Sequence, residues 1–345
     1  MSSIIKASTG LEFQINNQTS LSIDSNHNLQ LAGGLVAAGG LHANGMEVNP
    51  RWTTETRPTN PIDGMTGFNT TRRLPEYYSS INGGQWLKYN DLPALPLRYL
   101  VIGGGGGSSH YTWGQGGGGA GGFLENSAKI VNLGQTYNIV VGAGGYQANG
   151  QPSYFGNAVA YGGGSINATG GSGGGGGHSN PAQQGGASNQ TDNDGGFGYG
   201  NSGGAHRYSN PYPCGGGGGA GEAGESGAAR NAHGRGGAGR ISNITGSDVY
   251  YAGGGGAGGG NGGGGTGGVG GGGNGVSSGV GGSGGINTGG GGAAGNGGSG
   301  TGGSGVVILR LSAEYYSGEH TGSPVISYVG DDVVLQFNSS GTYTV

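Results

Sequence analysis

The chain has little of what usually builds a protein core or a catalytic site. Only 31% of its 345 residues are hydrophobic and 9% are charged. Cys214 is the only cysteine, which excludes an intrachain disulfide and a cysteine-rich zinc site. No apolar run approaches the ~20 residues that a membrane-spanning helix needs, and no segment has the apolar spacing of an amphipathic helix. We therefore expect no membrane insertion and no substantial α-helix.

Charged residues are few and scattered along the chain. The 13 Lys and Arg residues form no basic stripe, which argues against a nucleic-acid partner. The 17 Asp and Glu residues are dispersed, and no motif supports a catalytic triad or a carboxylate pair. We expect no enzymatic activity. The opening segment, MSSIIKASTG, has no apolar core of signal-peptide length, so we expect synthesis in the cytosol without a secretory signal.

Glycine is the residue present in excess, with 97 in the chain and 83 among the 203 residues from 103 to 305. Ordering each residue costs about 1–2 kcal/mol, and glycine lies at the expensive end. Because side-chain burial cannot offset this cost, backbone hydrogen bonds must. A polyproline II helix has three residues per turn and no internal hydrogen bonds, so it can bond to close neighbours where glycine permits the approach.

The placement of the other residues in this segment favours such a bundle. Non-glycine residues recur at three-residue spacing, as at Thr266 and Val269 and at Ser283 and Ile286. Runs of consecutive glycines would form the interior helices, and the polar and aromatic inserts would be turns at the two ends. The alternative is an irregular mass of glycine loops draped on a β-sandwich.

Short strands are expected on either side of the glycine runs. LEFQI, SLSI and NLQL alternate apolar and polar residues, and GMTGFNT with LPEYYS predicts a hairpin whose second strand Trp86 closes. LRYLVI (97–102) and GVVILRL (305–311) have strand character and are expected to be neighbours. We predict a mainly β fold: N-terminal strands (1–50), a β-hairpin neck (51–96), a β-sandwich with an inserted polyglycine II helix bundle (97–311), and C-terminal strands (312–345).

Several site motifs fail when they are tested. The glycines from Gly103 to Gly107 follow a strand, but no GKS or GKT is present and the next residues will not open a helix, so we exclude a phosphate loop. The seven histidines have no ligand-like spacing. In TDNDGG, Asp192 and Asp194 lack the closing Glu of an EF-hand loop and suit an Asx turn. We expect no cofactor and no metal.

The aromatic inserts are the best candidates for a binding site. SSHYTWGQ carries His110, Tyr111 and Trp113, and AHRYSNPYPC carries His206, Arg207, Tyr208 and Tyr212. Aromatic faces beside polar donors match the apolar rings and hydroxyls of sugars, and loops on a rigid scaffold often carry binding residues. We identify these seven as receptor-binding candidates. The alternative is that the aromatic side chains cap the ends of the bundle and shield them from water.

The order of several motifs resembles a known family. LRYLVIGGGGG, TYNIVVGAGG, SNITGSDVYYAGGGG and GGSGVVILRL follow one another as in the glycine-rich domain widespread in bacteriophage tail fibres and other virion proteins. The segment RPTNPIDGMTGFNTTRRLPEYYSSINGGQWLKY resembles one common in phage fibre and structural proteins. In composition the chain is similar to the tip adhesins of T-even-type long tail fibres, which are polyglycine II bundles whose loops touch the bacterial receptor.

One departure from the family pattern concerns the C-terminus. A segment like FxSSGTYTV normally precedes the LVIGGGG strand, whereas here VVLQFNSSGTYTV occupies residues 333–345. These strands complete the same sandwich, begin a truncated second copy, or pair with another subunit.

The resemblance implies a virion protein, either a tail fibre or a similar appendage, that recognises a host-surface saccharide. It also implies a homotrimer that attaches to other virion proteins through its N-terminal region. The main alternative is a purely structural virion component, such as a collar, head fibre or decoration protein. An ice-binding polyglycine protein is a third class, which the irregular inserts disfavour.

Overall fold

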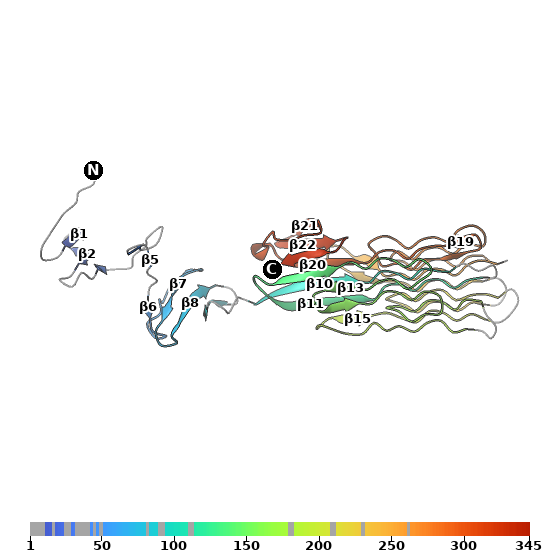
Figure 1. Ribbon diagram of the computed structural model, residues 1–345, viewed down its shortest axis with the longest axis horizontal. Coiled ribbons are helices and arrows are strands. Elements are labelled where there is room, and N and C mark those ends of the chain that lie inside the picture. Colours follow the sequence, from blue (N-terminus) through green and yellow to red (C-terminus); the bar gives the residue numbers. More distant parts are fainter. Residues whose placement is uncertain are drawn as a thin grey trace. The chain divides into compact units, whose positions relative to one another are not determined.

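The fold is that of a computed structural model, drawn in Figure 1, and its contacts divide the chain into two units, Met1–Asp91 and Leu92–Val345. The structure describes residues 51–80, 83–88, 94–109, 114–178, 183–207, 212–228, 232–260 and 263–345, and the backbone of five short strands between residues 11 and 47. Both units are built from β-strands. No helix in these described parts is long and apolar enough to cross a membrane.

The first unit begins with small antiparallel sheets. A three-stranded sheet has the order β1 (Leu11–Ile15), β2 (Gln18–Ile23) and β3 (Leu29–Leu31), and β4 (His42–Ala43) pairs with β5 (Met46–Glu47). These strands confirm the β character expected for residues 1–50. A four-stranded sheet follows, in the order β6 (Arg51–Trp52), β7 (Thr66–Asn69), β8 (Leu74–Ser79) and β9 (Gln85–Lys88).

The expected hairpin of the first unit is formed by β7 and β8, which pair antiparallel. Trp86 lies on a third strand, β9, which pairs antiparallel with β8, instead of closing the second strand. The Trp86 ring packs against Trp52 at 4.7 Å between centroids. The neck is therefore a sheet with its own small aromatic core.

A buried carboxylate fixes this core. The Glu76 side chain has no exposed surface and accepts hydrogen bonds from Trp52 Nε1 at 2.6 Å, Asn69 Nδ2 at 3.0 Å and the Arg57 guanidinium at 2.7 and 2.8 Å. Burial acts to raise its pKa, but these hydrogen bonds prevail and lower the pKa of Glu76 to about 2. Glu76 is therefore ionised at any physiological pH, with its charge matched by Arg57.

The second unit contains a β-sandwich. One sheet has six antiparallel strands in the order β15 (Phe197–Tyr199), β11 (Phe123–Asn132), β10 (Ala94–Ile102), β20 (Val306–Ser312), β22 (Asp332–Phe337) and β21 (Val325–Val329). The facing sheet has the order β14 (Ala158–Ala160), β13 (Ser153–Phe155), β12 (Thr136–Val140) and β23 (Gly341–Thr344). Tyr99 of β10 meets Phe155 of β13 between the sheets, at 5.5 Å between ring centroids.

The six-stranded sheet is buried on both faces at its centre, which explains the continuous apolar run in β10. Tyr99 faces the four-stranded sheet, while Leu100 and Ile102 point to the other face and join a core cluster with Ile244 and Tyr251. The latter two belong to the hairpin of β16 (Arg240–Ser242) and β17 (Val249–Tyr251) or to its turn. The smaller elements are β18 (Ala294–Gly295), β19 (Gly298–Ser299) and the 3-10 turn η2 (Ala313–Tyr315).

The C-terminal strands complete this same sandwich. The β10 and β20 strands pair from Arg98 with Arg310 to Ile102 with Val306, so the expected neighbours are confirmed. On the other side of β20 lies β22, and β23 pairs with β12 of the second sheet. Of the three arrangements left open by the sequence, the structure has the first.

The glycine runs extend away from the sheets as a bundle of parallel and antiparallel chains (Figure 1). In the first run, the amides donate to three neighbouring runs in turn, and every third amide returns to the same neighbour. Gly103 and Gly106 donate to the run at 119–122, Gly104 and Gly107 to that at 148–151, and Gly105 and Ser108 to that at 300–303, at N–O distances of 2.8–3.3 Å. A period of three is that of the polyproline II helix.

Interior runs are surrounded on all sides. The run at 116–122 donates to runs at 161–164, 215–218 and 289–292, and accepts from runs at 103–106 and 172–175 and from Gly255. The runs at 214–220 and 252–258 likewise bond to six neighbours each. The glycine segment is therefore a lattice of polyglycine II helices, and the alternative of irregular loops is wrong. Side chains at three-residue spacing point outwards, as Val269 (56% exposed) and Ile286 (78% exposed) do.

Candidate binding site at the distal end of the bundle

The end of the bundle farthest from the sheets, here called the distal end, gathers residues from several runs. Gly114 lies against Cys214, His233 and Gly259, and Gln115 bridges to Gly258. These residues stand at the ends of separate glycine runs. The distal end is therefore a surface made from many separate parts of the sequence, held at fixed spacing by the lattice.

An aromatic cluster lies at this end. The ring of His178 meets His206 at 5.6 Å between centroids and Tyr212 at 4.7 Å, both in T-shaped arrangements. His206 is only 2% exposed, its amide donates to Gln183 O at 2.9 Å, and neither ring nitrogen has a hydrogen-bond partner. Burial, and then the nearby His178, lower the pKa of His206, so its imidazole is neutral at neutral pH.

Two buried residues, Cys214 and His233, lie next to this cluster. The Cys214 amide donates to Nδ1 of His233 at 3.3 Å, and its thiol lies 3.5 Å from the carbonyl oxygen of Tyr212. Burial lowers the pKa of His233 and raises that of the Cys214 thiol to about 12. The thiol is therefore protonated and shielded, which makes it a packing group and unsuited to nucleophilic chemistry.

A cavity of about 340 Å³ opens next to His233. Glu225 and Arg235 line it and lie 4.0 Å apart as an exposed ion pair, with Ser226 and Thr266 adding hydroxyl groups. The distal end thus combines neutral imidazoles, a tyrosine ring and hydroxyls with little net charge. Such a surface can accommodate a polar, uncharged ligand.

The structure brings some of the predicted site residues together. His206 and Tyr212 share the aromatic cluster, and Arg207 is exposed next to them, with its amide bonded to Pro213 O at 3.1 Å. The other four candidates, His110, Tyr111, Trp113 and Tyr208, lie outside the described residues. His206 is buried, so it supports the cluster and does not present its ring to solvent.

Sequence reasoning missed His178, which joins His206 to Tyr212. It lies alone after five glycines, and only the lattice brings it to the 206–212 insert. The TDNDGG segment is a turn: Asp192 accepts from the Gly198 amide at 2.8 Å, and Asp194 pairs with Lys129 at 2.6 Å. Within the described part of the chain, no group of three or more His, Cys, Asp or Glu side chains could hold a metal ion.

Comparison with known proteins adds one assignment. A family model described as a glycine-rich domain matches residues 77–312, which covers the end of β8, all of β9 and the whole glycine lattice. No curated protein and no solved structure matches the chain. Since the model spans more than half of the sequence, and the lattice accounts for the glycines it matches, the chain belongs to the glycine-rich domain family.

Proposed function

We propose that this chain is a fibre-like bacteriophage virion protein that recognises a host-surface saccharide with the distal end of its glycine bundle. The observation that carries the proposal is the six-neighbour lattice, which brings the ends of separate glycine runs together and His178 to Tyr212. A backbone lattice contributes no chemistry of its own. Its value lies in rigidity, which reduces the entropy lost when side chains at the ends of the runs bind a ligand.

The chemistry of the distal end supports a sugar ligand. The Tyr212 ring and the partly exposed ring of His178 offer apolar faces and edges, and the neighbouring cavity offers hydroxyls and an ion pair of no net charge. Sugar rings present the same mixture of apolar C–H faces and hydroxyls. Multivalent display can raise weak affinities by about 10²–10⁴-fold, so each site can be weak.

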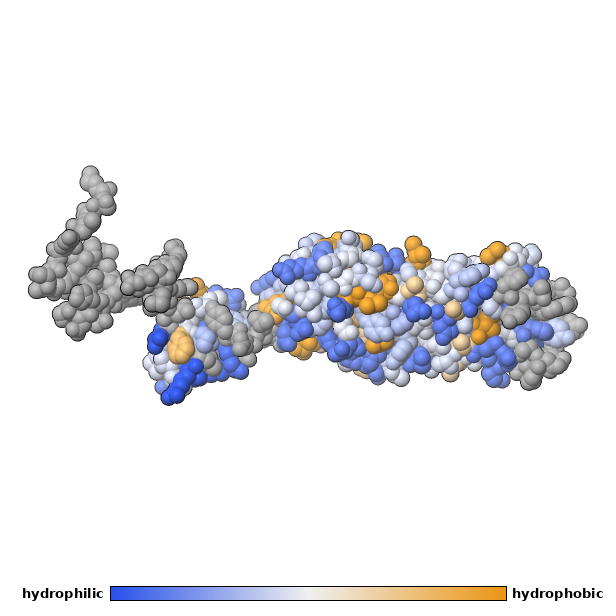
Figure 2. Space-filling model, viewed as in Figure 1, coloured by the Kyte–Doolittle hydropathy of each residue, from blue (hydrophilic) through white to orange (hydrophobic). Residues whose placement is uncertain are grey.

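We also propose a homotrimer, attached to other virion proteins through residues 1–50. An edge strand of the six-stranded sheet, β21, carries exposed Val325 (58%), Ile326 (37%) and Tyr328 (63%), which a neighbouring subunit could cover. The visible face in Figure 2 otherwise carries apolar side chains only in small groups among polar surface. Native mass spectrometry of the purified chain should give three times the chain mass of 33.4 kDa, and a monomer would contradict the fibre model.

Recognition at the distal end is tested by removing the Tyr212 ring. Tyr212 has a φ of 62°, so Tyr212→Gly deletes the ring at a position where glycine relieves backbone strain. A matched control is Ser323→Gly, at a φ of 49° and in the sandwich. We expect Tyr212→Gly to weaken binding of the labelled chain to host cells about tenfold, and Ser323→Gly to leave it unchanged.

Arg207→Ala provides a second test, because this side chain is exposed and only its backbone is bonded within the turn. If Tyr212→Gly and Arg207→Ala both bind cells and extracted surface polysaccharide as the parent does, the receptor-binding proposal fails. The purely structural virion role would then stand.

A further inference from the structure

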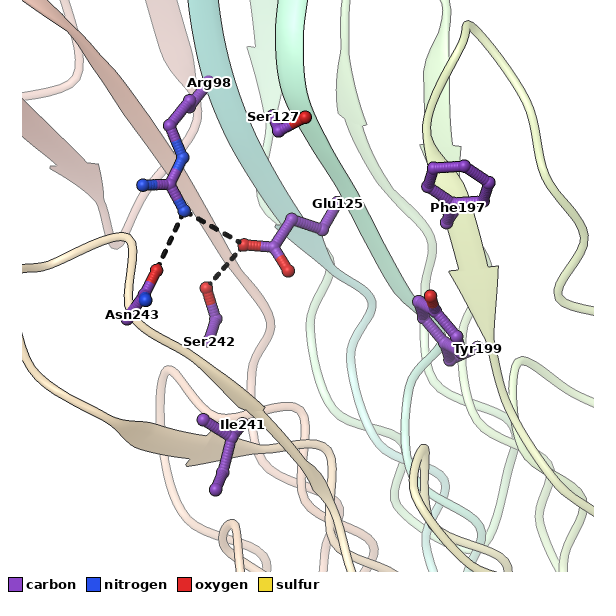
Figure 3. Close-up of a pocket in the computed structure, with 8 residues that line it drawn as sticks. All are labelled: Arg98, Glu125, Ser127, Phe197, Tyr199, Ile241, Ser242 and Asn243. Carbon is purple, nitrogen blue, oxygen red and sulfur yellow. Dashed lines mark hydrogen bonds and ion pairs between the residues drawn. The ribbon is translucent and has the colours of Figure 1, made fainter.

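We infer that a pocket on the side of the β-sandwich, separate from the distal end, is a second binding site, and that its ligand is a neutral sugar residue. The pocket has a volume of about 310 Å³ and lies where β10, β11 and β15 meet the β16 hairpin (Figure 3). That volume is at the lower end of the roughly 300–1,000 Å³ of small-molecule sites, which suits one or two sugar rings. The inference does not rest on the function proposed for the distal end.

One side of the pocket is polar and neutral overall. Arg98 Nη2 donates to Asn243 Oδ1 at 2.9 Å and lies 3.7 Å from Glu125 Oε1, which also accepts from the Ser242 hydroxyl at 2.7 Å. All of these contacts use Oε1 of Glu125 and Oδ1 of Asn243. Oε2 of Glu125 is therefore an acceptor, and Nδ2 of Asn243 a donor, for a ligand.

The Arg98 guanidinium, on a side chain that is 32% exposed, has one donor left unpaired. Its Nε is shielded from solvent and has no hydrogen-bond partner. The β10–β11 register shifts between Leu97 and Tyr99, and such irregularities re-aim a side chain at the bulge. Arg98, the charged residue inside an apolar strand, is thereby directed towards Glu125.

The other side of the pocket is aromatic. Phe197 is 63% exposed although it lies on a paired strand, and it is the cross-strand partner of Glu125. Directly paired residues point to the same face of a sheet with their Cβ atoms about 4.5–5.5 Å apart, so the ring and the carboxylate stand side by side. Figure 3 shows the Phe197 and Tyr199 rings across the pocket from Arg98 and Asn243.

Tyr199 is held in place and Phe197 is not covered. The Arg240 guanidinium lies over the Tyr199 ring at 3.5 Å, and the Phe123 ring meets it at 5.9 Å. Tyr199 is thus a fixed wall of the pocket. Phe197 offers a free face on which the C–H groups of a sugar can stack, while adjacent hydroxyls reach Glu125 and Asn243.

The charge balance selects the class of sugar. A sugar with a carboxylate would be repelled by Glu125, and a sugar with an amine would be repelled by Arg98. In each case the attraction to the oppositely charged residue of the pocket only offsets this repulsion. Hydroxyls can both donate to Glu125 and accept from Asn243. A neutral sugar is therefore the ligand that satisfies both sides.

The test uses the full-length chain and saturation-transfer NMR with methyl glycosides of glucose, galactose, mannose, N-acetylglucosamine and glucuronic acid. We expect at least one neutral glycoside to bind, with glucuronide weaker. Phe197→Ala should weaken that binding by about tenfold or more. The control is Tyr146→Ala, which removes an aromatic ring of the same 63% exposure outside the pocket and should leave binding unchanged.

Glu125→Gln distinguishes a binding role from a structural one. It keeps the shape of the side chain but leaves Arg98 as the only charge in the pocket, so the preference should reverse in favour of the glucuronide. Failure of every neutral glycoside to bind, or binding that Phe197→Ala does not weaken, would overturn the inference. An unchanged preference in Glu125→Gln would also overturn it. Binding that Tyr212→Gly weakens and Phe197→Ala does not would place the sugar at the distal end, so the failures of the two proposals are distinguishable.

Discussion

Replacing one interior glycine by alanine tests the lattice directly. A Cβ added to Gly117 would lie 1.9 Å from the carbonyl oxygen of Gly255, whereas ordinary contact begins at 3.4 Å. The runs at 116–122 and 252–258 would have to separate by about 1.5 Å, the difference between those two distances. A side chain at this position therefore cannot be accommodated without moving backbone.

The cost can be estimated from the bonds that such a separation breaks. Gly255 donates to Gly118 O at 2.9 Å, Gln115 to Gly258 O at 2.8 Å, and Gly258 to Gln115 O at 3.0 Å. A separation of about 1.5 Å takes all three beyond hydrogen-bonding distance. At about 1 kcal/mol for each bond, Gly117→Ala should lower the free energy of unfolding by about 3 kcal/mol.

The assay is thermal unfolding at a fixed scan rate, because large proteins with more than one unit can unfold irreversibly. For a unit of this size the expected fall in midpoint is about 6–12 °C. Gly263→Ala is the matched control: a Cβ there meets nothing within 4 Å, and the change in the unfolded chain is the same. If Gly117→Ala and Gly263→Ala unfold at the same temperature, the close-packed lattice is wrong.

Two further predictions concern buried groups. Because the folded pKa of Glu76, about 2, lies below its usual value of 4.5, its contribution to stability is complete above about pH 4.5 and is lost as the pH falls towards 2. Acid titration of the full chain by tryptophan fluorescence should show this loss. The Glu76→Gln variant should be less stable at neutral pH and should lack that acid dependence. If Glu76→Gln titrates as the parent chain does, the Glu76 hydrogen-bond network is contradicted. The Cys214 thiol, fully buried and with a pKa of about 12, should not react with a disulfide reagent at mildly alkaline pH until denaturant is added. Rapid reaction of the native chain would show that solvent reaches the Cys214 thiol, contrary to the structure.

The strands and the lattice could be predicted because they depend on local pattern. The apolar runs of β10 and β20 identified strands. Glycine has no side chain to bury, so a segment so rich in it could be ordered only by backbone hydrogen bonds. Three-residue spacing also held: Thr266 and Val269 accept from Gly236 and Gly239, which belong to one run. In each of these cases the residue type itself restricts the possible neighbours.

The sites could not be predicted to the same extent, because they depend on which runs become neighbours. Glycine runs are nearly interchangeable, so nothing local shows that His178 meets Tyr212, or that Glu125 lies beside Ser242, 117 residues later. The alternation of Phe197 and Tyr199 was a weak signal of a strand with an aromatic face. The charge at Arg98, inside an apolar strand, was a second signal whose partner the sequence did not reveal.

Amide hydrogen exchange of the native chain tests the central claim, that the glycine runs form an ordered lattice of backbone hydrogen bonds. Peptides covering the interior runs at 116–122, 214–220 and 252–258 contain almost no side chains that could shield them, so slow exchange there can come only from backbone bonding. We predict that these runs exchange as slowly as β10 and β20. Exchange at the rate of an unstructured chain in these three runs would contradict the account.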